Sequence, residues 1–236
     1  MAEKNISPNL YVIVPAYKEQ SHIGQTVRSI LEYSPNVLVV DDGSRDKTSE
    51  YAEEAGAVVL RHKDNRGKGE ALKTGFQYAR DQACDLVITM DADGQHRPDE
   101  IPKFVDAYRR TGIPILLGNR MADIENMPRI RRWTNAVMSW MLSRIMKQYI
   151  PDTQCGFRMY RGDILPFLSV ESQRFAAESE ILLYLADRGF RIDSVRVSTI
   201  YHNEKSMIKP GLDTLRFIAM ILRHMRNRKK GVAGRK

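Results

Sequence analysis

The chain has 236 residues, of which 42% are hydrophobic and 28% charged, a balance that is typical of a folded globular protein and argues against a disordered chain. Its net charge of +8 comes from residues 216–236, which contain eight lysines and arginines and no acidic residue, whereas the rest of the chain has 29 basic and 29 acidic residues. The basic charge therefore belongs to one terminal segment, and the neutral body is not predicted to bind nucleic acid.

The two cysteines, Cys84 and Cys155, fall in a predicted helix end and a predicted turn, and we expect both to be free thiols in a reducing compartment. The first residues have no apolar signal-peptide core, and no stretch approaches the roughly 18 to 20 apolar residues that span a bilayer. We therefore expect a cytoplasmic protein, either free or attached peripherally at the inner face of the cell membrane.

Short apolar runs rich in β-branched residues alternate with helical patterns in the first half of the chain. Strands are predicted at residues 10–14, 36–40, 57–60, 86–90 and 114–117. Helices are predicted around 23–31, at 47–55, from 65–69 to about 83, and at 98–110. This alternation favours an α/β fold with a mainly parallel central sheet and right-handed crossovers.

The second half is less regular. It contains a polar loop at 121–132, a helix from about 133 to 149, a short strand after 154–158, a helix at 175–188, a strand at 191–197 and a last helix at roughly 212–226. No internal repeat or low-complexity linker divides it.

The stretch Asp91-Ala92-Asp93-Gly94-Gln95-His96 directly follows a predicted buried strand. Its two aspartates therefore leave the carboxyl end of that strand together, and in an open α/β sheet this edge is where ligands bind. Carboxylate and amide oxygens with no thiolate beside them favour Mg²⁺ or Mn²⁺ over zinc, and such ions usually also hold a substrate phosphate. The alternative is an ordinary turn, because Asp-Ala-Asp-Gly is good turn chemistry after any strand.

Acidic residues also follow two other predicted strands: Glu19 follows the first, and Asp41 and Asp42 follow the second. Three acidic clusters at one edge of one sheet indicate a site. Neither Gly-x-Gly-x-x-Gly after the first strand nor a Gly-Lys-Ser/Thr loop occurs, so dinucleotide-binding and P-loop sites are not indicated. The segment 67–69, Gly-Lys-Gly, places one cation and a flexible backbone at a helix start, which suits nucleotide phosphates but also an ordinary helix-opening turn.

Six motifs occur in the order and spacing of one known family. They are Pro15-Ala16-Tyr17-Lys18-Glu19, Asp41-Asp42-Gly43-Ser44, Asn65-Arg66-Gly67-Lys68-Gly69, Asp91 to His96, Gly118-Asn119-Arg120 and Asp152 to Arg158. Over about residues 10–205 the chain resembles family 2 glycosyltransferases, and most closely the dolichyl-phosphate mannose synthases. The resemblance implies a GT-A catalytic domain at 1–211, followed at 212–236 by an amphipathic helix and a basic tail.

The resemblance also implies roles for individual residues. The base and ribose of a nucleotide sugar would be held by Pro15, Tyr17, Glu19 and Asp42, with Lys68 and Asp91 also at the bound donor. Mg²⁺ or Mn²⁺ on the diphosphate would be bound by Asp91, Asp93 and Gln95. The phosphate of a polyprenyl acceptor would meet Arg120 and Arg131. The sequence departs from the family at Lys18, where Asn is usual, and shows no counterpart of the transmembrane helices that many members carry.

An arginine cluster follows the predicted fifth strand, with Arg120, Arg129, Arg131 and Arg132 inside 13 residues. An alcohol acceptor needs a general base, whereas a phosphate oxygen is already anionic at pH 7 and needs only positioning, which arginines supply through bidentate contacts. A solvated run of charges is the alternative. For an alcohol acceptor, the candidate base or sugar-orienting residues are Glu178 and Glu180, unless these helical residues only face water.

Two amphipathic patterns remain. Trp133 and Trp140 are seven residues apart and share a helix face with basic residues nearby, which is the composition of a helix lying at a membrane interface. Packing against the sheet would give the same spacing. The last predicted helix carries an apolar stripe made by Leu215, Ile218, Ala219, Leu222 and Met225. That stripe would suit an anionic membrane surface, a homodimer or the protein core.

The sequence therefore predicts a metal-dependent, inverting glycosyltransferase that moves a mannose- or glucose-type sugar from a GDP- or UDP-linked donor to polyprenyl phosphate. The predicted catalytic residues are Asp93, Arg120, Arg131 and Glu178. Two alternatives stay open: transfer to a sugar or protein hydroxyl, and a nucleotide-binding or nucleic-acid-binding module without catalytic activity. A nucleotidylyltransferase would instead release pyrophosphate.

Overall fold

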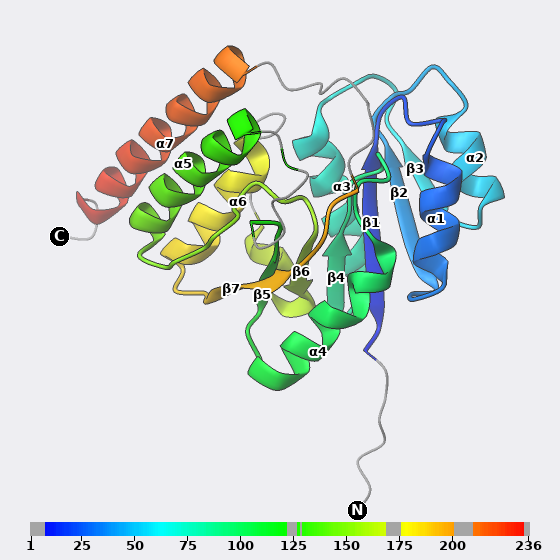
Figure 1. Cartoon of the computed structure of the whole chain (residues 1–236), viewed down its shortest axis with the longest axis horizontal. Coiled ribbons are helices and arrows are strands. Elements are labelled where there is room, and N and C mark those ends of the chain that lie inside the picture. Colours follow the sequence, from blue (N-terminus) through cyan, green and yellow to red (C-terminus); the bar gives the residue numbers. More distant parts are fainter. Residues whose placement is uncertain (1–7, 122–126, 128, 169–175, 201–209, 234–236) are drawn as a thin grey trace, which may run out of the picture.

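The computed structural model describes residues 8–121, 127, 129–168, 176–200 and 210–233. Its centre is a seven-stranded sheet in the order β3-β2-β1-β4-β6-β5-β7 (Figure 1). The strands are β1 (Leu10–Ala16), β2 (Asn36–Asp41), β3 (Val58–Arg61), β4 (Leu86–Thr89), β5 (Ile115–Asn119), β6 (Arg158–Arg161) and β7 (Ile192–Arg196). Strand β6 is antiparallel to both of its neighbours, and the other pairs are parallel. The predicted α/β fold with a mainly parallel sheet is confirmed.

This topology brings one set of strand ends to a single edge of the sheet. Ala16 at the end of β1 pairs with Asp41 at the end of β2, so the residues that follow both strands leave the sheet together. Because β6 runs the opposite way, its first residue, Arg158, lies opposite Thr89 of β4 and Leu117 of β5. The carboxyl ends of the parallel strands and the amino end of β6 therefore share this edge.

Helices cover both faces of the sheet, because alternate strand residues point to opposite sides and both sets are apolar. One face packs against α1 (Ile23–Leu31), α2 (Thr48–Glu54) and α4 (Ile101–Thr111), and the 3₁₀ turn η1 (Pro98–Glu100) contacts α1 and α4. The other packs against α3 (Lys68–Asp81), α5 (Arg129–Met146), the 3₁₀ turn η2 (Gly162–Phe167) and α6 (Ala176–Asp187), and α7 (Pro210–Ala233) packs on α6. None of the helices that the structure describes has both the length and the apolar character needed to cross a bilayer.

Helix α5 differs from its prediction at both ends. It begins at Arg129, so the polar loop predicted at 121–132 is wrong over its last residues, and Arg131 and Arg132 lie in the first helical turns. Arginine is a good helix former despite its charge, and polarity alone had suggested a loop. The helix ends at Met146 because Lys147 adopts a left-handed backbone conformation with φ of +55°.

Helix α7 is longer than predicted and buries a different stripe. Phe217, Met220 and Ile221 are buried in the core cluster that also contains α6. The predicted stripe residues Ile218 and Leu222 are instead exposed, as is Met225, so these three do not face the core. The side chains of 210–216, Leu215 among them, lie outside the described ones. A separate unit at 212–236 stays a prediction.

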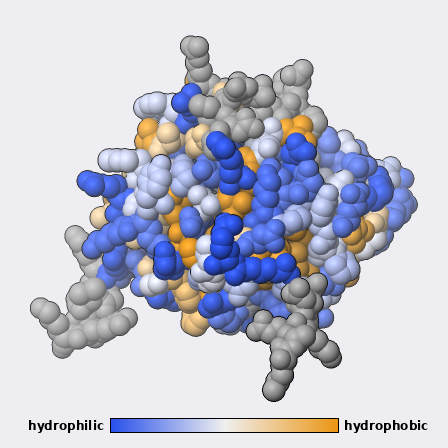
Figure 2. Space-filling view, turned by 60° about the horizontal axis from the view of Figure 1, so that its bottom comes forward, coloured by the Kyte–Doolittle hydropathy of each residue, from blue (hydrophilic) through white to orange (hydrophobic). Residues whose placement is uncertain are grey.

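On the face of the molecule shown in Figure 2, hydrophilic side chains cover most of the surface, and hydrophobic surface is confined to patches between them. Both cysteines are buried free thiols, as predicted. Burial raises the pKa of Cys84 to about 11 and that of Cys155 to about 12, so both thiols stay protonated near neutral pH.

Candidate active site at the carboxyl edge of the sheet

Asp42 anchors the loop that leads into α3. Its buried carboxylate accepts hydrogen bonds from the backbone N–H of Arg66 at 2.9 Å and of Gly67 at 2.6 Å, and His62 Nδ1 lies 2.7 Å from Oδ1. Gly67, with φ of +94°, adopts a conformation that other residues rarely reach. In this structure Asp42 therefore positions the start of α3, while its contact with a nucleotide stays a prediction.

Lys68, the first residue of α3, joins two carboxylates from distant parts of the chain. Its ammonium group contacts Asp91 Oδ1 after β4 and lies 3.2 Å from both Glu178 carboxylate oxygens on α6. Burial opposes the charge on Lys68, but Asp91 and Glu178 outweigh burial and raise the pKa of Lys68 above its ordinary value. These three predicted site residues are thus brought together, and their central cation is charged at neutral pH.

Asp91 is held from several sides. His96 Nε2 lies 3.4 Å from Asp91 Oδ2, and a Cβ atom at Gly156 would lie 2.5 Å from the same oxygen, so any larger residue at position 156 would displace this carboxylate. Burial acts to raise the pKa of Asp91, but Lys68 and then His96 outweigh it and hold that pKa well below its usual range. Gly156 was quoted only as part of a motif, because its contact with Asp91 spans two segments far apart in the sequence.

Asp93 and Gln95 complete the loop after β4. Asp93 Oδ1 accepts a hydrogen bond from the backbone N–H of Gln95 at 3.0 Å, and both side chains are partly exposed. Burial first, and the charge of Asp91 second, raise the pKa of Asp93. Two carboxylates whose charges repel each other would both be stabilised by a shared cation.

This donor set suits a hard divalent cation that also binds a substrate phosphate. Among the described residues there is no group of three or more His, Cys, Asp or Glu side chains placed to hold a metal ion by themselves. Mg²⁺ in particular is commonly held by one or two carboxylates together with substrate phosphates and water. Asp91 and Asp93, with the amide of Gln95, fit that pattern and do not fit a closed zinc site.

Arg120, which follows β5, forms a buried bidentate pair with Asp152. Its Nε lies 2.7 Å from Oδ2 and its Nη2 lies 3.0 Å from Oδ1, and its backbone N–H donates to Oδ2 at 3.2 Å. Burial acts to raise the pKa of Asp152, but Arg120 outweighs it and lowers that pKa. This pairing was not predicted, because it joins residues 32 positions apart and no local pattern of the sequence indicates it. Contact of Arg120 with an acceptor phosphate stays a prediction.

Arg158 holds the turn at 152–157 against α6. Its fully buried guanidinium donates to the backbone carbonyls of Cys155 at 2.7 Å, Glu178 at 2.7 Å and Thr153 at 3.0 Å. These bonds fix the turn that packs on Asp91 and, at the same time, the first turn of α6 that carries Glu178. Sequence reasoning included Arg158 in a motif without recognising that role.

The roles of the other predicted residues stay predictions. Pro15 is buried in β1, Tyr17 and Glu19 follow it partly exposed, and Arg131 is partly exposed on α5. Glu180 faces α7, where it pairs with Arg223 at 3.0 Å, so of the two glutamates on α6 it is Glu178 that lies in the site. The side chain of Arg129 lies outside the described ones.

Comparison with known proteins identifies the family. The glycosyl transferase family 2 model matches residues 11–167. A UDP-N-acetylglucosamine–dolichyl-phosphate N-acetylglucosaminyltransferase from Methanococcus voltae is 30% identical over 89% of this chain and 90% of its own length. An undecaprenyl-phosphate mannosyltransferase from Micrococcus luteus is 29% identical over 80% of this chain and 82% of its own length.

A solved structure has the same fold. Glucosyl-3-phosphoglycerate synthase from Mycobacterium tuberculosis, in complex with Mn²⁺, UDP and glucosyl-3-phosphoglycerate, matches with a TM-score of 0.74 and 20% identity over 92% of this chain and 80% of that chain. This likeness confirms the predicted GT-A fold. The family match, together with the carboxylate edge described above, shows that the chain belongs to glycosyl transferase family 2.

Proposed function

We propose that this protein transfers a sugar from a nucleoside-diphosphate sugar to polyprenyl phosphate, with inversion at the anomeric carbon. The observation that carries the proposal is the meeting of Lys68, Asp91 and Glu178 beside Asp93 at the edge where β5 also delivers Arg120. The two relatives described above, whose names specify dolichyl phosphate and undecaprenyl phosphate, support the acceptor class.

The donor would lie across the carboxyl ends of β1, β2 and β4. Asp91, Asp93 and Gln95 would hold Mg²⁺ or Mn²⁺, which when bound neutralises the negative charge that develops on the leaving diphosphate. Lys68 is already fixed at this edge by two carboxylates, so its ammonium can turn toward a diphosphate oxygen without leaving the site. Tyr17 and Glu19, which follow β1, would meet the base and ribose.

The engagement of Glu178 favours a phosphate acceptor over an alcohol. A carboxylate paired with a lysine ammonium is a poor general base, because removing a proton from an alcohol would compete with that ion pair. A phosphate oxygen needs no such base, and its charge can be met by Arg131 on α5. Glu178 then orients Lys68 and the sugar hydroxyls.

A thermal-unfolding screen with UDP, GDP and their sugar conjugates, each with and without Mn²⁺, tests this proposal. A ligand at 100 times its dissociation constant stabilises by about 2.7 kcal/mol, and for a chain of this length each kcal/mol raises Tm by roughly 2–4 °C. We expect a Mn²⁺-dependent rise of roughly 5–11 °C with one nucleotide class, and loss of the Mn²⁺ dependence in Asp93→Asn. No rise with any nucleoside diphosphate would contradict the donor assignment.

A further inference from the structure

Helix α5 carries a second apolar stripe in addition to the one that packs on the protein. Its buried side is formed by Asn135, Ser139, Leu142 and Met146. On the outward side, Ile130 is 78% exposed, Trp133 69% and Trp140 63%, and Val137 is also exposed. Large apolar side chains rarely gather in the open on a monomer without a partner. This outward stripe is therefore available for binding.

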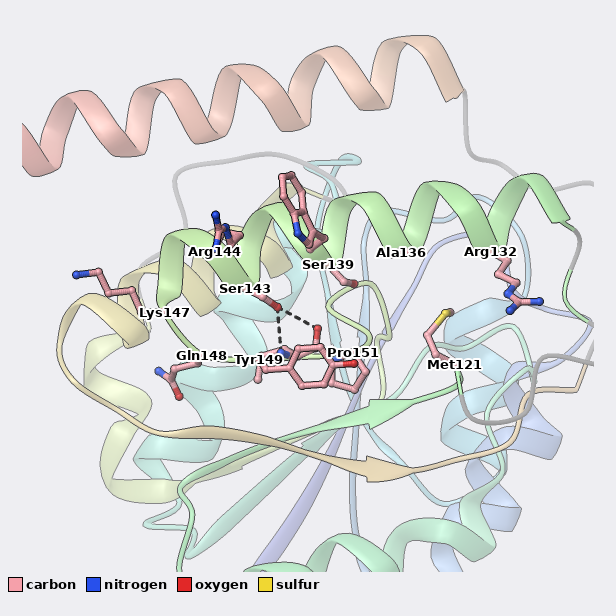
Figure 3. Close-up of a pocket in the computed structure, with 12 residues that line it drawn as sticks. Met121, Arg132, Ala136, Ser139, Ser143, Arg144, Lys147, Gln148, Tyr149 and Pro151 are labelled. Carbon is pink, nitrogen blue, oxygen red and sulfur yellow. Dashed lines mark hydrogen bonds between the residues drawn. The ribbon is translucent and has the colours of Figure 1, made fainter.

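Helix α7 presents a comparable stripe beside it. Ile218, Leu222 and Met225 are exposed, with Leu222 at 62%, while the opposite side of α7 packs on α6. Figures 1 and 3 both show α7 running alongside α5 in the same direction. We call the outward stripes of these two helices the α5–α7 outer face.

A groove along α5, on the side away from α7 in Figure 3, adjoins this face at Trp140 and adds positive charge beside it. It has a volume of about 460 Å³ and is lined by apolar side chains, including Trp140 and Tyr149, by three basic residues, and by no acidic residue. Figure 3 shows Arg132 toward one end of the groove and Arg144 and Lys147 toward the other. Arg144 also lies over the Trp140 ring, 6.0 Å from its centroid.

The polar groups in the groove wall already have partners. Ser143 donates to the carbonyl of Ile150 and accepts from its backbone N–H, and Ser139 pairs with Thr153. What the groove offers to an outside ligand is therefore its cations and its apolar rim. This chemistry matches a phosphate-bearing amphiphile.

The charge pattern selects among the partners of such a face. Helix α5 contains no acidic residue, and the described side chains of α7, residues 217–228, include none either. On α7, Arg223 and Arg228 pair with Glu180 and Asp187 of α6, so the charge that a partner would meet comes mainly from Arg132, Arg144 and Lys147. A second copy docked on the same face would set these three cations against their counterparts, which disfavours a symmetric dimer. Tryptophan and arginine beside exposed aliphatic side chains are instead typical of a helix lying at a lipid–water interface.

We propose that the α5–α7 outer face docks on an anionic phospholipid bilayer, with Trp133 and Trp140 at headgroup depth and an acidic headgroup in the groove. This proposal rests on the proposed function: docking would bring the enzyme to its polyprenyl phosphate acceptor, which resides in a bilayer. Arg131, the predicted acceptor-phosphate residue, lies at the start of the same helix, one turn before the buried Asn135 and therefore on the inward side of α5.

Tryptophan fluorescence tests the docking directly, because Trp133 and Trp140 are the only two tryptophans in the chain. Full-length protein is titrated with vesicles of phosphatidylcholine, alone or mixed with phosphatidylglycerol, that contain no polyprenyl phosphate and no nucleotide. We expect a blue shift and protection from acrylamide quenching only with phosphatidylglycerol, together with co-sedimentation. Trp133→Ala should weaken the co-sedimentation.

The charge-reversed variant Arg144→Glu/Lys147→Glu keeps both tryptophans and should bind at least about tenfold more weakly, since each basic residue near an anionic surface contributes roughly a fivefold factor. Arg109→Glu/Arg110→Glu, at two exposed residues of α4 on the opposite face of the sheet, reverses the same number of charges, and this matched control should bind like the unmodified protein.

Three results would overturn the docking proposal: no spectral change with either vesicle, equal losses in the variant and its control, or a blue shift without vesicles that accompanies a doubling of molecular mass. Transfer to a short-chain, water-soluble polyprenyl phosphate is measured in parallel. Protein that transfers but ignores vesicles refutes the docking alone, whereas vesicle binding without any transfer refutes the proposed function.

Discussion

The Arg120–Asp152 pair offers a quantitative test of how the site edge is held together. Asp152 is fully buried, and its two oxygens accept four hydrogen bonds, three from Arg120 and one from the backbone N–H of Gln154. Asp152→Asn removes the charge with little change in shape and leaves a buried guanidinium uncompensated. Removing one partner of a buried ion pair costs roughly 3–5 kcal/mol, so Tm should fall by roughly 6–20 °C.

The chain contains a matched control. Arg161 and Asp163 form a bidentate pair with similar distances, 2.6 and 2.8 Å, but the Asp163 side chain is 61% exposed. An exposed pair contributes only about 0–1 kcal/mol, so Asp163→Asn should lower Tm by at most about 4 °C. Urea unfolding of both variants measures the difference. If Asp152→Asn lowers the free energy of unfolding by no more than Asp163→Asn does, the reasoning from burial is refuted.

The pH dependence supplies a second check on this pair. The pKa of Asp152 in the folded protein lies below its unfolded value of about 3.9. The ion pair therefore makes its full contribution to the free energy of unfolding above about pH 3.9, and this contribution is lost as the pH falls through the folded pKa. The stability deficit of Asp152→Asn should therefore be largest near neutral pH and shrink in acid. A deficit that grows as pH falls would reverse the assigned direction of the pKa shift.

Three further substitutions test individual residues. Asp93→Asn should lower sugar transfer by roughly 100-fold or more with little change in Tm, and Asp106→Asn on α4 is the exposed control; near-normal transfer would remove Asp93 from the metal site. Arg131→Ala should strongly reduce transfer to polyprenyl phosphate while sparing slow donor hydrolysis. Arg131→Lys should also be impaired, because an ammonium group cannot make the two parallel hydrogen bonds of a guanidinium. Parallel loss of both activities would indicate a structural role. Lys18→Asn should raise stability by several tenths of a kcal/mol in urea unfolding, because φ at position 18 is +60° and Asn tolerates that region better; destabilisation would show that the Lys18 contact with the Tyr17 ring matters more.

The sequence was sufficient to predict the order of strands and helices and the edge at which the acidic residues gather. Apolar β-branched runs and helical spacing are local signals, and the parallel topology places residues that follow β1, β2 and β4 together. The usual Asn at position 18 now has a physical explanation as well, since the backbone there is left-handed. The family-level resemblance was specific because six motifs agreed in order.

What could not be predicted depends on contacts between distant segments. The buried pairing of Arg120 with Asp152 and the three carbonyls held by Arg158 join parts of the chain that no periodicity connects. In α7 the apolar residues occur around much of the helix, so the sequence did not show that Phe217, rather than Ile218, faces α6. The start of α5 was missed because arginines at a helix start resemble a polar loop.

Direct assay of transfer tests the central claim most directly. Labelled UDP- and GDP-sugars are incubated with Mn²⁺ and either a short-chain polyprenyl phosphate or the corresponding polyprenol, and the labelled lipid and the released nucleotide are identified. The account predicts one sugar joined to the polyprenyl phosphate, release of a nucleoside diphosphate, and no product with the polyprenol. Equal transfer to the polyprenol, release of pyrophosphate, or no lipid product from any donor would contradict it.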